Sequence, residues 1–159
     1  MAEVDDVSLI LLGNGPAHAE LQRQINASGA SKRIRIVSGA ADEQRNALLA
    51  QADALVLPSQ ERTEAFGVVL LEAMRWAKPV IVADIPGSGA PWLVRSSDSG
   101  IVVPTGAWDQ LTEAIRLLKD DPELRQSLGT NGREALAGRF SIGAAVASID
   151  AIYDEARSA

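Results

Sequence analysis

The fold of this chain is decided by residues 54–83, ALVLPSQERTEAFGVVLLEAMRWAKPVIVA. Two short apolar runs lie at its ends, at 54–57 and 79–83, and a longer apolar run at 66–74 lies between them. Short apolar runs without alternation are typical of strands that are buried on both faces, and parallel strands need a helical crossover. The stretch therefore predicts a strand, a helix and a second strand parallel to the first.

The same alternation continues on both sides of this stretch. Further apolar strands are predicted at residues 7–12, 34–37 and 100–104. The last third is helical, with Asp121-Pro122 predicting one capped helix start and Ser141 predicting another. Strands that alternate with helices through short loops imply the α/β class. We expect a Rossmann-like, three-layer arrangement in which a parallel sheet is covered by helices on both faces.

Composition limits the classes of function. The 159 residues carry a net charge of −6 and include six aromatic residues, one histidine and no cysteine. Thiol catalysis, disulfides and zinc–thiolate sites are excluded, as is a site built from several histidines. The acidic balance argues against a nucleic-acid partner. We expect a single domain over residues 1–159, with no metal and no cofactor.

The chain also lacks the sequence signals of a membrane protein. No stretch approaches the roughly 20 apolar residues that a spanning helix needs. Residues 1–6 are acidic and contain no basic segment of the kind that begins a signal peptide. The sequence therefore predicts a cytoplasmic protein.

Two glycine-containing loops follow predicted strands, at the sheet edge where ligands bind in such folds. Gly13 and Gly15 begin like a dinucleotide fingerprint, but His18 stands where the third glycine belongs. This loop is either a tight turn or a place where backbone N–H groups approach a phosphate. The second loop, Gly87-Ser88-Gly89, is either a flexible turn or an N–H concavity for a phosphate or an acceptor.

The most informative loop follows the strand at 54–57. Gly67 stands where a helix begins, so neighbouring N–H groups can bind an anion. Glu72 lies in a helix that is apolar nearly all round, and a buried carboxylate needs hydrogen-bond donors. Sugar hydroxyls would serve, and so would an arginine or backbone N–H groups. The residue type alone leaves these alternatives open.

The segment Glu64-Ala65-Phe66-Gly67-Val68-Val69-Leu70-Leu71-Glu72 resembles the E-x7-E signature of retaining glycosyltransferases of family 4, also called group 1, which have the GT-B fold. The likeness covers approximately residues 7–157. Its other matching elements lie at 52–59, 78–81, 100–104, 121–124 and 139–141.

This resemblance implies a role for each matching position. Glu64 would be the catalytic residue and contact the hydroxyls of the donor sugar near the reacting carbon. Glu72 would hold the ribose hydroxyls of the nucleotide. The N–H groups of Phe66-Gly67-Val68 would meet the sugar and the diphosphate, and Ser38-Gly39-Ala40 would lie beside the base.

The resemblance also implies a place in a larger enzyme. The chain would be the C-terminal, donor-binding half of a two-domain GT-B protein whose N-terminal acceptor domain is missing here. Its partner would be a nucleotide-diphosphate sugar, a GDP- or UDP-linked hexose. The complete enzyme would transfer the hexosyl group to a hydroxyl acceptor in cell-surface polysaccharide synthesis, and the isolated domain would be inactive. Contact with the inner membrane would be peripheral and indirect, through the acceptor.

Two departures from the family pattern leave other functions open. The basic G-R-x-x-x-K-G-like loop that neutralises the diphosphate in the family is absent. The sequence Gly87-Ser88-Gly89-Ala90-Pro91-Trp92 replaces the commoner Gly-Gly loop and resembles branches that use mannose-like donors. Half of a nucleotide-sugar epimerase or phosphorylase is one alternative, and a non-catalytic nucleotide-binding module is another.

Overall fold

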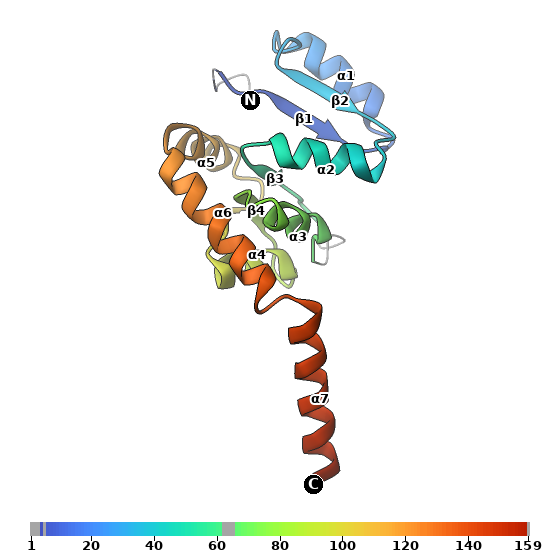
Figure 1. Cartoon of the computed structure of the whole chain (residues 1–159). Helices are drawn as coiled ribbons and strands as arrows, with labels where there is room; N and C mark the ends of the chain where they lie inside the picture. The colour runs from blue at the N-terminus through green and yellow to red at the C-terminus, as the bar shows by residue number, and fades with distance from the viewer. Residues whose placement is uncertain (1–3, 5, 62–65, 159) are drawn as a thin grey trace.

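Strands and helices alternate along the chain in the computed structural model, which describes residue 4, residues 6–61 and residues 66–158 (Figure 1). The α/β class is thereby confirmed. In chain order the elements are β1 Leu9–Leu12, α1 His18–Ala27, β2 Ile34–Val37, α2 Asp42–Gln51, β3 Leu55–Leu57, α3 Val68–Arg75, β4 Val80–Asp84, α4 Gly89–Ser97, β5 Gly100–Pro104, α5 Trp108–Asp120, α6 Pro122–Ala137 and α7 Ile142–Ser158.

All the strand pairs are parallel, as predicted, but the strands form two sheets rather than the expected continuous one. β1 pairs with β2 in the first sheet, and the second has the order β3-β4-β5. The division arises because the chain leaves β2 through α2 and then pairs β3 with β4 instead of β1. Within the described residues, one edge of β1 therefore has no strand partner, and Ile10 and Leu12 on this strand stay 37% and 43% exposed.

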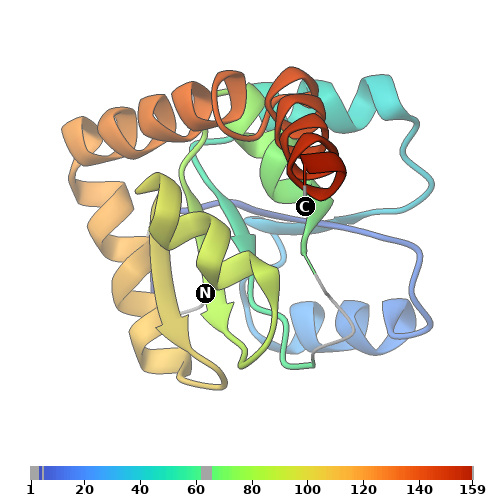
Figure 2. The same cartoon turned by 90° about the horizontal axis from the view of Figure 1, so that it is seen from below.

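The three-stranded sheet carries helices on both faces, as Figure 2 shows from below. Successive residues of β4 point to opposite faces of the sheet. Val80 and Val82 pack with Met74 of α3 in one cluster, and Ile81 packs with Leu118 of α5 in the other. These side chains are almost completely buried. Burying an aliphatic side chain of this size contributes about 1.5–3 kcal/mol to folding, so β4 holds the two helical layers together.

Both predicted helix caps in the last third are confirmed. The Asp121 carboxylate accepts a hydrogen bond from the N–H of Leu124 at 2.8 Å, which starts α6. The Ser141 hydroxyl accepts one from the N–H of Ala144 at 3.1 Å, which starts α7. Such caps satisfy amide groups that have no partner inside the helix.

Helix α7 projects away from the rest of the molecule (Figure 1). The apolar side chains along one face of α7 are exposed: Ile142, Val146, Ile149, Ile152 and Tyr153. No single described helix is long and apolar enough to cross a membrane; α6 and α7, which bend by 47° at their junction, reach that length and composition only as a pair.

Candidate functional site

The start of α3 follows β3 at its carboxyl end, where the ligand-binding edge of a parallel sheet is expected. Gly67 precedes the helix with a φ of 76°, in the left-handed region that favours glycine. A Cβ atom there would lie 3.1 Å from the Leu57 side chain and 3.2 Å from that of Leu70. The left-handed backbone favours glycine, an added Cβ atom would crowd Leu57 and Leu70, and the predicted helix start is confirmed. Because the first amides of a helix have no acceptor within it, they can face an anion.

The residues beside this glycine are open to ligands. Phe66 is 36% exposed and Val68 is 65% exposed. Glu64, the predicted catalytic residue, belongs to the segment 62–65 and lies outside the described residues. The assignment of Glu64 therefore stays a prediction, as does the expected contact of residues 66–68 with a sugar diphosphate.

Glu72 lies on α3 and forms an ion pair with Arg45 on α2. Arg45 Nη2 donates to Glu72 Oε1 at 3.1 Å, and Nη1 of the same guanidinium lies 3.2 Å from a carboxylate oxygen of Asp42. The expectation that Glu72 is buried is wrong, because its side chain is 28% exposed on the side of α3 that meets α2. Of the partners left open by the sequence, arginine is the one that the structure provides.

The ion pair leaves hydrogen-bonding capacity on both groups. No described residue donates to Glu72 Oε2, so this oxygen can accept from a ligand hydroxyl. Arg45 Nε is buried and has no hydrogen-bond partner among the described residues. The guanidinium of Arg45 holds one oxygen of the half-buried Glu72 carboxylate. The carboxylate is thereby oriented so that its other oxygen can accept a hydrogen bond from a ligand.

The loops after β1 and β2 are joined directly. The side-chain oxygen of Asn14 accepts a hydrogen bond from the N–H of Gly39 at 2.6 Å, and Gly39 has a φ of 67°. The predicted base loop, Ser38-Gly39-Ala40, leads straight into α2, so Arg45 lies in the first turns after it. The Asn14–Gly39 hydrogen bond thus joins the first loop to the second, and the chain continues from the second loop into α2. Arg45 of α2 then pairs with Glu72 of α3.

Nothing described in the structure requires glycine at the two positions of the first loop. Neither Gly13 nor Gly15 has a positive φ, and a Cβ atom added to either would meet no described atom within 4 Å. The carbonyl of Gly15 accepts a hydrogen bond from the N–H of His18 at 3.3 Å, as in a β-turn, and a type I turn needs no positive φ. Open backbone at this edge of the sheet is compatible with the approach of a ligand, which stays a prediction.

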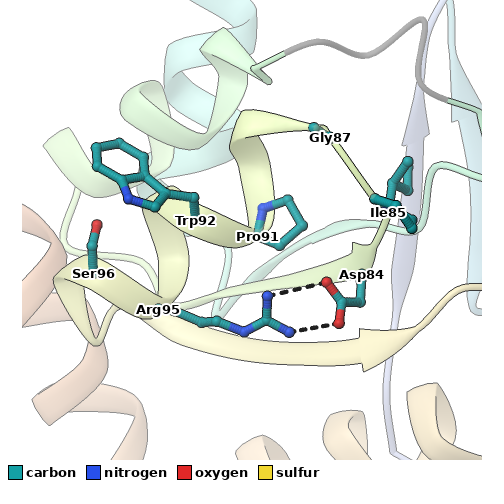
Figure 3. Close-up of a pocket in the computed structure, with 9 residues that line it drawn as sticks. Asp84, Ile85, Gly87, Pro91, Trp92, Arg95 and Ser96 are labelled. Atoms are coloured by element: carbon teal, nitrogen blue, oxygen red, sulfur yellow. Dashed lines mark hydrogen bonds and ion pairs between the residues drawn. The ribbon is translucent and has the colours of Figure 1, made fainter.

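The loop Gly87-Ser88-Gly89 lies elsewhere, beside a pocket of about 520 Å³ along α4 (Figure 3). The Ser88 hydroxyl accepts a hydrogen bond from the N–H of Ala90 at 3.3 Å and so caps α4. The described contacts do not join this loop to the Arg45–Glu72 pair. The described contacts thus join two of the three predicted loops to each other, and the third lies beside the pocket along α4.

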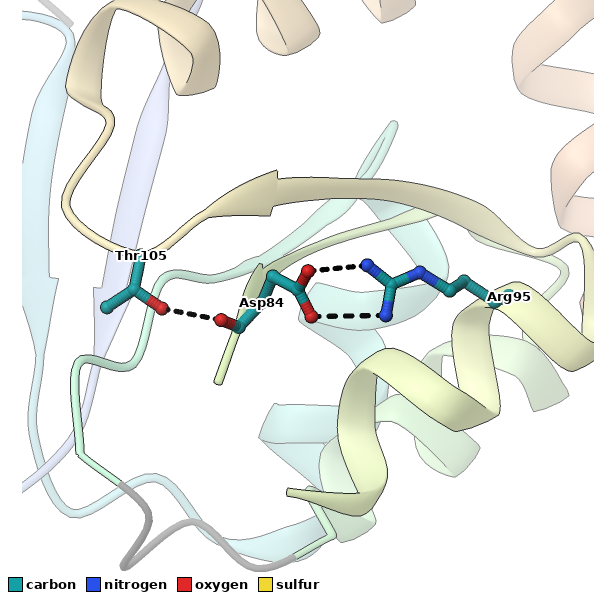
Figure 4. A network of polar contacts seen from close by, with 3 residues as sticks. All are labelled: Asp84, Arg95 and Thr105. Carbon is teal, nitrogen blue, oxygen red and sulfur yellow. Dashed lines mark hydrogen bonds and ion pairs between the residues drawn. The ribbon is translucent and has the colours of Figure 1, made fainter. Parts of the chain in front are cut away.

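An ion pair between Asp84 and Arg95 forms one wall of this pocket along α4 (Figures 3 and 4). Arg95 Nη1 and Nη2 donate to the two carboxylate oxygens of Asp84 at 3.1 and 2.6 Å. The hydroxyl of Thr105 donates to the backbone carbonyl of Asp84 at 2.9 Å. The hydrogen bonds from Arg95 lower the pKa of the Asp84 carboxyl, and the same contact raises the pKa of Arg95.

Sequence reasoning missed both charged pairs. Arg45 is 27 positions from Glu72, so no local spacing connects them, although the sequence did predict that Glu72 needs a donor. Asp84 carried a signal that went unused, because it directly follows the predicted strand at 79–83. Within the described residues, no group of three or more His, Cys, Asp or Glu side chains could hold a metal ion.

The comparisons with known proteins agree on one protein family. The family model described as "Glycosyl transferases group 1" matches residues 1–135. Alpha-D-kanosaminyltransferase of Streptomyces kanamyceticus is 32% identical over 94% of this chain and 38% of its own length. O-antigen chain mannosyltransferase C of Escherichia coli is 31% identical over 88% of this chain and 37% of its own length. The chain thus spans well under half the length of these relatives.

Solved structures have the same fold. The crystal structure of HepE of Anabaena in complex with UDP-glucose is 28% identical to this chain, with a TM-score of 0.77 over 98% of this chain and 42% of that one. The arrangement of helices and strands is therefore that of GT-B glycosyltransferase structures, as expected.

Proposed function

We propose that this chain, which belongs to the group 1 glycosyl transferases, is the donor-binding domain of a retaining hexosyltransferase. It binds a nucleotide-diphosphate sugar and, together with an acceptor-binding domain, transfers the hexosyl group to a hydroxyl acceptor. The transfer belongs to glycan synthesis, and one similar protein is named as an O-antigen chain mannosyltransferase.

The observation that carries this proposal is the ion pair between Arg45 and Glu72. The pair joins α2, which follows the loop proposed for the base at 38–40, to α3, whose start is proposed for the diphosphate. Ribose connects base and diphosphate in any nucleotide, so its hydroxyls belong near this pair. Glu72 Oε2 accepts from a ribose hydroxyl while Arg45 holds Oε1, which fixes the carboxylate before the ligand arrives.

The remaining chemistry follows from the helix start and from Glu64. The amide groups after Gly67 face the diphosphate and stabilise the negative charge that grows on it as the sugar leaves. Glu64 contacts hydroxyls of the hexose near the reacting carbon. We assign no metal to the site, because helix amides and side chains stabilise the negative charge of the diphosphate. Cationic side chains outside this chain would add to them.

The nucleotide is a diphosphate of uridine or guanosine. UDP-glucose is the ligand in the similar HepE structure, which supports a nucleotide sugar for this fold. The base itself is selected at the loop 38–40, where the backbone of Gly39 is fixed by Asn14.

A backbone NMR titration of the chain with UDP, GDP, UDP-glucose and GDP-mannose tests the proposal. We expect saturable shifts at Gly39, Gly67 and Glu72, with one base preferred over the other. Binding to this chain by itself should be weak, because residues 1–159 supply no G-R-x-x-x-K-G-like basic loop to the diphosphate. Shifts confined to other surfaces, or none with any of the four ligands, would contradict donor binding.

A further inference from the structure

The pocket along α4 takes no part in the proposed donor site. Its wall is formed by the end of β4, the loop that follows it, and α4 itself (Figure 3). At about 520 Å³ it falls within the roughly 300–1,000 Å³ typical of small-molecule sites. Trp92 and Arg95, one turn apart on α4, both line it.

Trp92 gives the pocket an ordered aromatic surface. Its side chain is 57% exposed, yet its ring packs edge-on against Phe140, with centroids 5.9 Å apart and planes at 74°. The guanidinium of Arg139 lies 5.1 Å from the centre of the Phe140 ring and also donates to the carbonyl of Ser96. This support holds the indole in place while much of its surface stays free to contact a ligand.

The charges in the pocket select for an uncharged ligand. Asp84 and Arg95 neutralise each other, so neither a phosphate nor a cation meets a net opposite charge. Their side chains are 45% and 56% exposed, which leaves them within reach of a ligand. A carboxylate accepts hydrogen bonds and a guanidinium donates them, and a hydroxyl does both. Several hydroxyls beside an apolar face are the features of a sugar ring.

We propose that this pocket binds the pyranose ring of an uncharged sugar. The hydroxyls of the ring bond to Asp84 and Arg95 on one side of the pocket, and Trp92 borders the pocket on the other. The inference does not depend on donor binding at Glu72. It also chooses between the ligands that the sequence left open for the loop at 87–89, because a sugar acceptor or product fits this pocket better than a phosphate does.

The test follows the indole N–H signals of the chain by NMR. The sequence has three tryptophans, Trp76, Trp92 and Trp108, so three Trp→Phe variants assign the three signals. The probes are methyl α-D-mannopyranoside, methyl α-D-glucopyranoside and inorganic phosphate. We expect a saturable shift of the Trp92 signal with at least one glycoside, no saturable shift of the Trp108 signal, and none with phosphate.

Substitutions then locate the site. Binding in each variant is followed through the backbone amide signals of the pocket residues, because a Trp92 variant has no indole signal at this position. Trp92→Ala and Asp84→Asn should each weaken glycoside binding at least tenfold. Trp92→Phe keeps a ring against Phe140 and should lose less. Trp108→Ala is the matched control, because Trp108 is 53% exposed and lies on α5, outside the pocket. Circular dichroism of each variant confirms that it is folded.

Three results would overturn the inference: no saturable shift with either glycoside, equal shifts at Trp92 and Trp108, or a saturable response to phosphate at Trp92. A parallel titration with UDP and GDP keeps the two proposals apart. Nucleotide binding should be unchanged in Trp92→Phe. Glycoside binding without nucleotide binding would contradict only the proposed donor site. Nucleotide binding without glycoside binding would contradict only the proposed sugar site along α4.

Discussion

Arg45 and Glu72 are 27 positions apart in the sequence, and the structure joins them at 3.1 Å across the packing of α2 on α3. The pair couples the helix that follows the second strand to the helix of the E-x7-E segment. An isolated half-buried carboxylate would make its replacement by an apolar residue favourable. The guanidinium reverses that expectation, because removing the Glu72 carboxylate leaves the half-buried Arg45 with Asp42 as its one remaining described ion-pair partner and with Nε still unpaired.

Glu72→Gln should therefore weaken nucleotide binding more than it disturbs the fold. The amide keeps the shape but loses a charged acceptor, and hydrogen bonds to charged groups contribute about 1.5–3 kcal/mol. We expect the Kd for the preferred nucleoside diphosphate to rise about tenfold or more, since 1.4 kcal/mol is a factor of ten. Calorimetry and thermal melting on the same sample compare the two effects. Normal affinity with a much lower Tm would assign Glu72 to structure alone.

Arg45→Met should lower both stability and affinity, whereas Arg45→Lys should lower mainly affinity. Methionine leaves Glu72 without its cation, at a cost of about 1 kcal/mol for a partly exposed pair. Lysine keeps the charge but cannot hold the carboxylate in a fixed plane. Urea unfolding measures the first effect and nucleotide titration the second. The exposed pair Glu20–Arg23 provides the control, and Arg23→Met should change neither quantity.

Gly67→Ala should destabilise the fold by about 1–3 kcal/mol, the range for a non-glycine residue held in the left-handed region. Contacts near 3.1 Å with the Leu57 side chain add to this cost. Gly13→Ala is the matched control, since it has neither a positive φ nor a described neighbour within 4 Å of the new Cβ atom. Its free energy of unfolding should stay within about 0.5 kcal/mol of the parent chain. Equal effects of the two substitutions would contradict this interpretation.

Local patterns in the sequence were sufficient for most of the fold. The apolar runs placed β2 and β5 at their observed bounds, and the caps at Asp121 and Ser141 are as predicted. The division into two sheets was not predictable, because a strand's apolar pattern does not say which strand lies beside it. Periodicity likewise identifies an apolar face but not what covers it, and the apolar face of α7 is exposed.

The candidate site was predictable in part. Gly67 was identified because its position between a strand and a helix is a local feature. Glu72 was identified as a carboxylate in need of a partner, but the identity of that partner depends on the packing of α2 against α3. Both charged pairs, at Glu72 and at Asp84, join residues from different elements, and such contacts carry no signal in the spacing of a single sequence.

The Asp84–Arg95 pair should make stability depend on pH. The hydrogen bonds from Arg95 lower the pKa of the Asp84 carboxyl below its ordinary value of 3.8. A carboxyl whose pKa is lower in the folded state stabilises the fold above the unfolded value and loses that contribution as the pH falls through the folded value. The Tm of the parent chain should therefore exceed that of Asp84→Asn at neutral pH, and the difference should shrink in acid. A constant difference across this range would contradict the assignment.

Glu64→Ala should separate sugar contact from nucleotide contact. By resemblance Glu64 meets the sugar at the reacting centre, so its loss removes interactions that matter most in the transition state. We expect affinity for the bare nucleoside diphosphate to stay nearly unchanged and hexosyl transfer by the complete two-domain enzyme to fall strongly. Because the sequence predicts a loop at Glu64, its loss should change the free energy of unfolding by no more than about 0.5 kcal/mol. The measurements are nucleotide titration and turnover on the same variant, with Glu61→Ala as the neighbouring control. Unchanged turnover would remove Glu64 from the site, and a parallel loss of nucleotide affinity would exchange the roles proposed for Glu64 and Glu72.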